Sequence, residues 1–185
     1  MNDPAIGLIE LTSIAAGFEV ADVMLKAGKV KLLLSRSICS GKYMILIGGD
    51  AANVKSAVAE GCFVAEGCLI DSLVIPKVHP DVFNAIGRSN VILPDHKGAL
   101  GILESFNVAT LIEAADAVVK AAPVVLQEVR LAMALGGKAF CTLTGDVSSV
   151  QAAVAAGRKV IADAGVLVKA VVISRPHPDV YREVL

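Results

Sequence analysis

The sequence predicts an α+β protein built from two tandem copies of one small β-α-β-β-α-β unit. Three observations lead to this prediction: short strings recur in the second half, strand and helix patterns alternate in the same order in both halves, and 185 residues suit two units of about 90 residues each. Gly7-Leu8-Ile9-Glu10 recurs as Gly101-Ile102-Leu103-Glu104, and His79-Pro80-Asp81-Val82 recurs as His177-Pro178-Asp179-Val180. We expect the two domains to cover residues 5–93 and 98–185.

The first unit is expected to open with a strand and a helix. Residues 6–14 form a mostly apolar run that suits a buried strand. Residues 15–27 show helical spacing, because Val20, Val23 and Ala27 can share one apolar stripe. A glycine follows at the position where a helix stop is expected.

The middle of the unit is expected to be a pair of strands. Residues 30–37 and 43–48 are apolar runs of strand length. Ser40-Gly41 interrupts the pattern between them, so residues 38–42 are expected to form a turn or loop.

A helix, a strand and a short helical segment are expected to complete the unit. Asp50 suits the N-cap of a helix that runs to about residue 60. Residues 69–75 suit a strand, which Pro76 ends. Pro80 suits the first turn of the short helix that follows.

The second unit is expected to repeat this order, with a loop at residues 131–138 that is two residues longer than its counterpart. Each unit would then be a mainly antiparallel sheet with helices on one face, in a split βαβ arrangement. The expected elements are strands over 100–106, 124–130, 139–144 and 167–173 and helices over 109–121 and 146–156.

The composition favours protein partners over membranes and nucleic acids. A mean hydropathy of +0.69 is high for two small cores, so we expect the surplus apolar side chains at interfaces. The sequence has neither an uncharged apolar run of membrane-spanning length nor a signal peptide, which predicts no membrane partner and a cytoplasmic protein. A net charge of −1 and an aromatic content of 4% argue against nucleic-acid binding.

The sequence carries no motif typical of an enzyme active site, so we expect a protein that is not an enzyme. His79 and His177 each precede a proline at an expected helix start, and helix initiation explains both without chemistry. Gly41-Lys42 and Gly136-Gly137-Lys138 lack the spacing of a phosphate-binding loop. Motifs of the G-x-S-x-G and HExxH types are also missing from the sequence.

Four cysteines occur without a CxxC pair. Cys62, Cys68 and Cys141 are expected to be buried, Cys141 within a core strand. Cys39 falls in the polar loop between two strands. From the residues alone, an inert small side chain and a metal ligand remain open for it, and the first is more common.

Taken together, the repeated strings resemble the bacterial microcompartment shell-protein domain. The resemblance rests on Gly7-Leu8-Ile9-Glu10, Ala21-Asp22 with Lys26, Gly41-Lys42 and Gly49-Asp50 and on their counterparts in the second half. It covers nearly the whole chain, in the family's unpermuted order. Two fused copies resemble the tandem-domain shell proteins, which implies a homotrimer of pseudohexameric shape that joins other hexagonal shell proteins in a microcompartment shell in the cytoplasm.

The loop from Ser35 to Lys42 is similar to the central loop of a tandem-domain member in which three cysteines hold an iron–sulfur cluster on the threefold axis. This resemblance implies one [4Fe–4S] cluster per trimer on three copies of Cys39, which match three corners of a cubane. Its expected role is electron transfer across the shell, with delivery or storage of a cluster for an enclosed enzyme as the alternative. An enclosed redox enzyme is a candidate partner. Ser40 stands where that relative has proline.

The resemblance also implies positions for other residues. Lys26 and Lys120 would lie at the edges where neighbouring assemblies meet. A solvated cation near a helix C-terminus is the alternative for both, and the edge role is preferred because both copies keep the lysine. The expected pore-lining residues are Ile38, Cys39, Ser40, Ala132, Met133 and Ala134.

Two other functions remain open. The first is a shell protein whose open central pore conducts small metabolites, with Cys39 as a pore-lining thiol and no cluster. The second is a small metabolite-binding domain of the split βαβ type.

Overall fold

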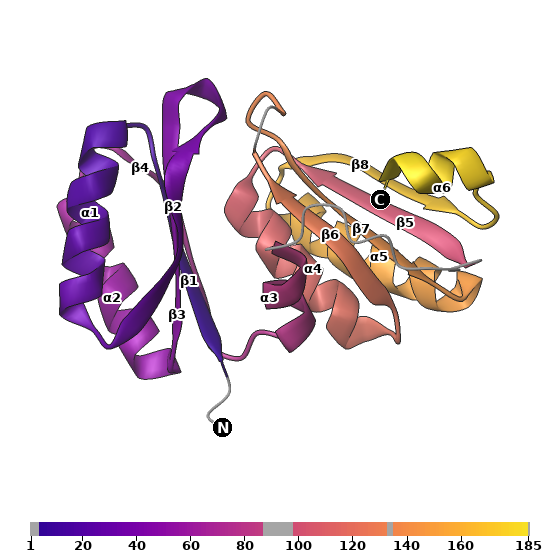
Figure 1. Ribbon diagram of the computed structural model, residues 1–185, viewed down its shortest axis with the longest axis horizontal. Coiled ribbons are helices and arrows are strands. Elements are labelled where there is room, and N and C mark those ends of the chain that lie inside the picture. The colour runs from indigo at the N-terminus through magenta and orange to yellow at the C-terminus, as the bar shows by residue number, and fades with distance from the viewer. Residues whose placement is uncertain (1–3, 87–97, 133–134, 185) are drawn as a thin grey trace. The chain divides into compact units, whose positions relative to one another are not determined.

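The computed structural model describes residues 4–86, 98–132 and 135–184. The chain divides into two compact units (Figure 1). Unit 1 comprises Met1–Val78 with Met133–Gly137, and unit 2 comprises His79–Ala132 with Lys138–Leu185. A short helix that ends the first sequence repeat therefore groups with unit 2.

Unit 1 is a four-stranded antiparallel sheet in the order β2-β3-β1-β4 with two long helices. Because β1 and β2 are each antiparallel to β3, they are parallel to one another with β3 between them, as predicted for a split βαβ unit. The elements are β1 (Ala5–Leu11), α1 (Ile14–Ala27), β2 (Val30–Ile38), a 3-10 turn (Cys39–Gly41), β3 (Lys42–Gly49), α2 (Ala51–Val64) and β4 (Leu69–Ile75).

Unit 2 repeats this architecture, with the sheet order β6-β7-β5-β8 and every pairing antiparallel. The predicted fold class is confirmed in both units. The elements are α3 (Pro80–Ile86), β5 (Ala99–Ser105), α4 (Val108–Ala121), β6 (Val125–Leu131), β7 (Ala139–Gly145), α5 (Val147–Asp163), β8 (Leu167–Ile173) and α6 (Pro178–Val184).

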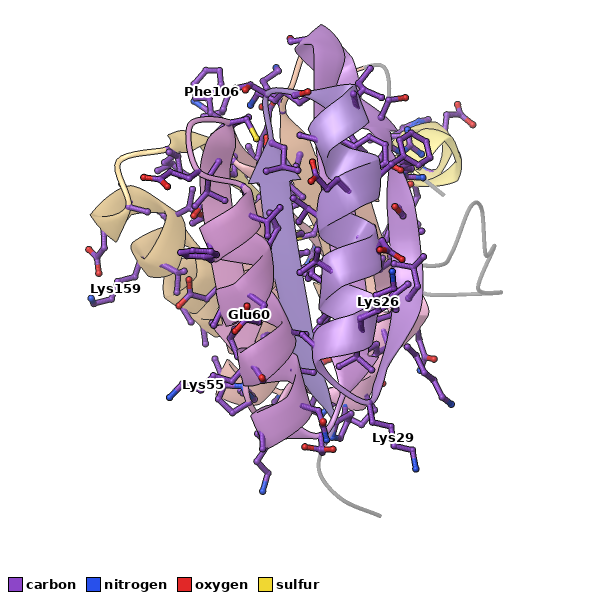
Figure 2. The ribbon with its side chains drawn as sticks, turned by 90° about the vertical axis from the view of Figure 1, so that its left-hand side faces the viewer. Lys26, Lys29, Lys55, Glu60, Phe106 and Lys159 are labelled. Carbon is purple, nitrogen blue, oxygen red and sulfur yellow. The ribbon has the colours of Figure 1, made fainter. Side chains whose placement is uncertain are left out.

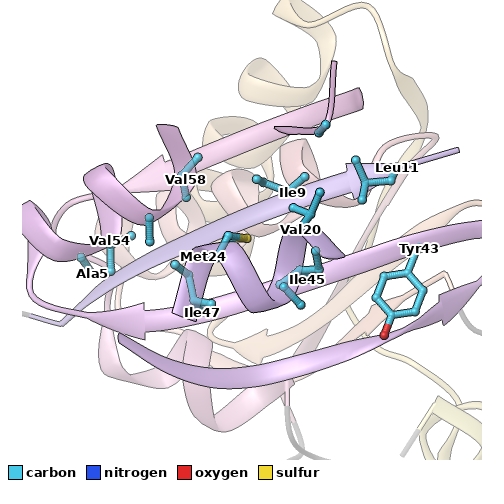
Figure 3. Packing of buried hydrophobic residues seen from close by; sticks show 13 residues of the cluster. Ala5, Ile9, Leu11, Val20, Met24, Tyr43, Ile45, Ile47, Val54 and Val58 are labelled. Carbon is cyan, nitrogen blue, oxygen red and sulfur yellow. The ribbon is translucent and has the colours of Figure 1, made fainter. Parts of the chain in front are cut away.

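Figure 3 shows how the two helices of unit 1 pack on its sheet. Ile9 and Ile45 project from the sheet toward Val20 and Met24 of α1 and Val54 of α2, and all five side chains are buried. Alternate strand residues thus bury one face of the sheet under the helices.

Capping residues explain where the helices begin. The expected strand over 6–14 ends at Leu11, because the Ser13 side chain accepts a hydrogen bond from the Ala16 backbone N–H and starts α1. Asp50 caps α2 in the same way, through the Asn53 backbone N–H. Asp146 occupies the N-cap position of α5 without a side-chain capping bond.

Two helices run past their predicted ends, through glycines that allow a close approach to the sheet. The helices expected to end near residues 60 and 156 continue to Val64 and Asp163. A Cβ atom on Gly61 would lie 2.5 Å from Ile9 Cδ1. Glycine therefore lets α2 cross the sheet closely and does not end the helix. Within the described residues, none of the helices is both long and apolar enough to span a bilayer.

Candidate functional site

The β2–β3 hairpin holds Cys39 in a tight turn. Ile38 pairs with Lys42, and the three residues between them, Cys39–Gly41, form the turn. Ser40 has φ 66° and Gly41 has φ 73°. Proline cannot occupy position 40 in this turn, because its ring fixes φ near about −65°. The loop therefore differs from one with proline at this position.

Cys39 is partly exposed at the tip of the hairpin. The backbone N–H of Leu135, in the part of the β6–β7 loop that groups with unit 1, donates a hydrogen bond to Cys39 Sγ over 3.3 Å. The turn thus presents a thiol that is both accessible and hydrogen-bonded.

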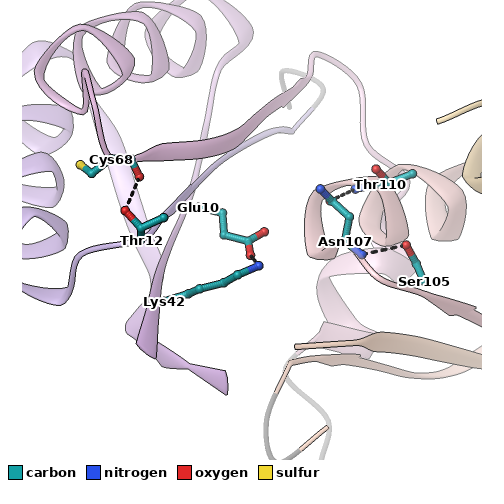
Figure 4. Close-up of polar contacts among 7 residues, drawn as sticks. All are labelled: Glu10, Thr12, Lys42, Cys68, Ser105, Asn107 and Thr110. Carbon is teal, nitrogen blue, oxygen red and sulfur yellow. Dashed lines mark hydrogen bonds and ion pairs between the residues drawn. The ribbon is translucent and has the colours of Figure 1, made fainter. Parts of the chain in front are cut away.

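An ion pair that no sequence motif predicted joins the base of the hairpin to β1. Lys42 Nζ lies 2.8 Å from Glu10 Oε1 on β1, and the Glu10 side chain is almost fully buried (Figure 4). Lys138 and Glu104 repeat the pair in unit 2 at 2.5 Å. Glu10 and Lys42 recur in the second half as Glu104 and Lys138, and this repetition is a hint that the residues matter, but it does not show that they pair.

Glu10 depends on Lys42 as its counter-charge. Its strand neighbour Met44 is fully buried, and Glu10 Oε2 is buried with no hydrogen-bond partner among the described residues. A buried carboxylate depends strongly on its single counter-charge. Lys42, which directly follows the turn, is therefore fixed in position.

The expected pore-lining residues occupy different environments within one chain. Ser40 is exposed and Cys39 is partly exposed, whereas Ile38 and Ala132 are buried. Met133 and Ala134 lie outside the described residues. Their arrangement around a pore stays a prediction.

The other cysteines differ from Cys39 in their surroundings. Cys62 and Cys68 are half-buried against the core of unit 1, and Cys68 Sγ donates to the Ala65 carbonyl over 3.3 Å. Burial raises the pKa of the Cys141 thiol to about 12, so it stays protonated. In the part of the chain that the structure describes, no three His, Cys, Asp or Glu side chains gather within one chain to hold a metal ion.

Lys26 and Lys120 each pair with an aspartate one turn earlier. Lys26 Nζ lies 2.5 Å from Asp22 Oδ2, and Lys120 Nζ lies 2.5 Å from Asp116 Oδ2. Lys26 projects from the outer surface of the α1–α2 layer (Figure 2). There it borders a shallow depression of about 370 Å³ that Glu60 also lines.

His79 and His177 stand at helix starts, as predicted. Pro80 and Pro178 are the first residues of α3 and α6. Each histidine Nδ1 accepts the backbone N–H two residues on, from Asp81 or Asp179. Each histidine side chain thus takes part in the first turn of the helix that follows it.

Comparison with known proteins identifies relatives over the whole chain. A family model described as the BMC domain matches residues 5–78 and again residues 99–176. The chain is 44% identical over 181 residues to the bacterial microcompartment shell protein PduT of Citrobacter freundii, covering 98% of this chain and 97% of that protein.

Solved structures give the same result. A crystal structure of a microcompartment protein from Desulfitobacterium hafniense DCB shares 46% identity over 97% of this chain and 99% of that one, with a TM-score of 0.89. A fused, permuted hexameric shell protein from the RMM microcompartment has a TM-score of 0.63 at 23% identity, over 86% of this chain and 82% of that one, which shows a shared fold alone. The resemblance drawn from the repeated strings is confirmed.

Proposed function

Because this chain belongs to the bacterial microcompartment domain family and is a structural shell protein, we propose that three copies form a homotrimeric tile with an iron–sulfur cluster at its centre. Each chain supplies two units of the same fold, so three chains supply six similar lobes. In a threefold arrangement with these loops facing the axis, three copies of each loop would meet there, one from each chain. The trimer with its six lobes is called the tile below.

The observation that carries the proposal is the partly exposed Cys39 thiol at the hairpin tip. The matching loop of the second repeat, residues 131–138, contains no cysteine. A tile therefore offers three equivalent thiolates, the number needed to bind three irons of a [4Fe–4S] cube, and leaves the fourth iron to a non-protein ligand. One chain alone cannot bind the cluster, because it supplies only one such thiolate.

The surroundings of Cys39 fit this group. Thiolate is the ligand that iron–sulfur clusters use, and the Leu135 backbone N–H donates to the Cys39 sulfur. Hydrogen bonds of this kind stabilise the more negative, reduced state of a bound cluster and raise its potential. Below the turn, the Lys42–Glu10 ion pair fixes the position from which Cys39 projects.

When bound, the cluster would supply one-electron transfer at an opening that connects the two sides of the shell. The chain's own part is to hold the three sulfurs and to keep the hairpin rigid. An enclosed redox enzyme is the partner that would exchange electrons on the inner side. We propose no catalytic turnover by the shell protein itself.

The experiment is anaerobic reconstitution of the purified protein with iron and sulfide, followed by visible absorption and iron analysis. We expect a brown trimer with about four irons per three chains. Cys39→Ser is expected to remove the colour and leave the trimer intact. Cys68→Ser is the matched control, because Cys68 is also partly exposed but lies after α2, and it should keep the iron.

A trimer that stays colourless after reconstitution would contradict the cluster and favour an open pore for small metabolites. A brown Cys39→Ser trimer would assign the iron to other ligands. A chain that remains single at micromolar concentration would contradict the tile itself.

A further inference from the structure

Ser40 has a backbone conformation that serine rarely adopts. Its φ of 66° lies in the left-handed region, where a Cβ atom crowds a backbone carbonyl oxygen. The matching residue of the second repeat is Gly136, whose φ of 62° is nearly the same. Glycine adopts this conformation without strain. The backbone of the turn therefore does not require serine, and the first repeat keeps a strained side chain that the second repeat lacks.

The strained serine lies directly beside the proposed ligand Cys39 at the hairpin tip. Figure 1 shows the β2–β3 hairpin extending beyond the helices of unit 1. Ser40 is exposed there. Because consecutive Cα atoms are about 3.8 Å apart, the Ser40 hydroxyl is within reach of a group bound to Cys39 of the same chain. Residues held in unfavourable backbone regions concentrate at functional sites, which gives the Ser40 side chain a candidate role at this one.

Glycines flank the Ser40 side chain. A Cβ atom on Gly137 would lie 3.8 Å from Ser40 Oγ, and a Cβ atom on Gly41 would have no other atom within 4 Å. Gly137 belongs to the segment that groups with unit 1 and whose Leu135 N–H donates to Cys39 Sγ. Since neither glycine has a side chain, the space around the hydroxyl stays open. The turn thus leaves room for a bound group next to both the sulfur and the hydroxyl.

Two other polar side chains of the hairpin are engaged within unit 1. The Ser35 hydroxyl makes a 2.9 Å hydrogen bond with the Tyr43 hydroxyl, and Lys42 binds the Glu10 carboxylate. The matching loop of the second repeat, residues 131–138, has no hydroxyl side chain in its sequence. The side-chain donor that is nearest in sequence to a group on the cysteine is therefore the serine that follows it.

We infer that the Ser40 hydroxyl donates a hydrogen bond to a sulfur atom of the bound iron–sulfur cluster and raises the cluster's reduction potential. The inference rests on the proposed cluster and names a residue that tunes it. Hydrogen bonds to the sulfurs are among the factors that set the potential of such clusters. A donor stabilises the reduced state more than the oxidised state, because the reduced state carries one more negative charge. A tile has three copies of Ser40 beside its three copies of Cys39, so the contributions add.

Redox titration of the reconstituted trimer measures this potential. Ser40→Ala removes the hydroxyl and keeps the strained Cβ atom, whereas Ser40→Gly removes both. We expect both variants to bind about four irons per three chains. Their potential should fall below the native value by at least about 59 mV, which is tenfold in the equilibrium constant of a one-electron reduction. Ser37→Ala, at an exposed position of β2 two residues before Cys39, is the matched control and should keep the native potential.

Asparagine and aspartate at position 40 separate hydrogen bonding from shape. Their side chains have the same outline and both tolerate a positive φ, but only the asparagine amide donates hydrogen bonds at neutral pH. Ser40→Asn is therefore expected to restore most of the native potential, and Ser40→Asp to give the lowest potential of the series. A serine that only shaped the turn would instead leave Ser40→Ala, Ser40→Gly and Ser40→Asn with the same potential as the native tile.

Thermal unfolding, measured alongside, distinguishes the hydroxyl from the backbone. Ser40→Gly should be at least as stable as the native protein while its potential falls. An unchanged potential in Ser40→Ala and Ser40→Gly trimers with a full cluster would overturn the inference and leave the cluster in place. A shift in Ser40→Gly alone, or loss of iron from both variants, would also overturn it, because serine would then act through the conformation of the turn. Native trimers that acquire no iron would overturn the proposed function as well.

Discussion

Units 1 and 2 share their sheet order, their helix pair and their Glu–Lys ion pair, but they differ in two places. The β2–β3 turn carries Cys39, whereas the corresponding loop in unit 2 is longer and has no cysteine. Strand β6 is covered by α3, whereas β2 exposes leucines. The two units share the framework of the fold, and they differ at the turn where a bound group is proposed and on the face of β2. This comparison can be tested one matched pair at a time.

The largest expected effect concerns the lysines that both units retain. Reversing the charge in Lys26→Asp or Lys120→Asp places a second carboxylate beside Asp22 or Asp116 at a proposed tile edge. We expect each variant to lose the extended sheets visible by electron microscopy and to remain trimeric. Lys159→Asp on the exposed face of α5 is the control. Sheets that form normally with aspartate at position 26 would rule out the edge role.

The next effect separates the two ion pairs by their burial. Lys42→Met leaves Glu10 nearly buried without its cation, and we expect it to lower the free energy of unfolding by about 3 kcal/mol. Lys138→Met leaves Glu104, whose side chain is 28% exposed, and should cost about 1 kcal/mol or less. Chemical denaturation measures both. Equal losses of unfolding free energy in the two variants would show that the deeper burial of Glu10 does not make its ion pair more important than that of Glu104.

A smaller effect is expected at the two matching turns, where serine and glycine can be exchanged in both directions. Ser40 at φ 66° corresponds to Gly136 at φ 62°, since each precedes a glycine and a lysine. Ser40→Gly is expected to stabilise unit 1 by up to about 1 kcal/mol, because glycine adopts this conformation without strain, and Gly136→Ser should destabilise unit 2 by a similar amount. Ser40→Pro should disrupt the turn and reduce iron binding. Thermal unfolding of all three variants measures these changes in stability. A Ser40→Pro protein more stable than the native one would contradict the positive φ at position 40.

The smallest expected effect compares two helix caps. The Asp50 side chain accepts from the Asn53 backbone N–H, whereas Asp146 makes no such bond. Asp50→Ala should lower Tm by about 2–4 °C, and Asp146→Ala by less. The hydrogen bonds from Asn53 lower the pKa of Asp50, so its stabilising contribution is present at neutral pH and is lost as pH falls through that lowered value. The difference between the native and Asp50→Ala proteins should therefore shrink in acid, and a constant difference would contradict this.

Much of the fold could be predicted because local signals agreed with the tertiary structure. Strands 69–75 and 167–173 have the predicted bounds, and Pro80 and Pro178 start the short helices as expected. The ends of α2 and α5 could not be predicted, because Gly61 and Gly157 each serve a close approach that only the packed structure reveals.

The candidate site was only partly predictable. The hairpin position of Cys39 follows from the two flanking strands and the Ser40-Gly41 break. The positive φ of Ser40 does not, because serine rarely adopts that conformation. The Glu10–Lys42 pair and the contact from Leu135 to Cys39 join residues distant in sequence, and a single sequence does not specify such contacts.

Native mass spectrometry of protein prepared without oxygen tests the central claim most directly. We predict a complex of three chains that carries the added mass of one [4Fe–4S] cluster, and three chains with no added mass once Cys39 is replaced by serine. A single chain, or three chains of native sequence that never acquire iron and sulfide, would contradict the account.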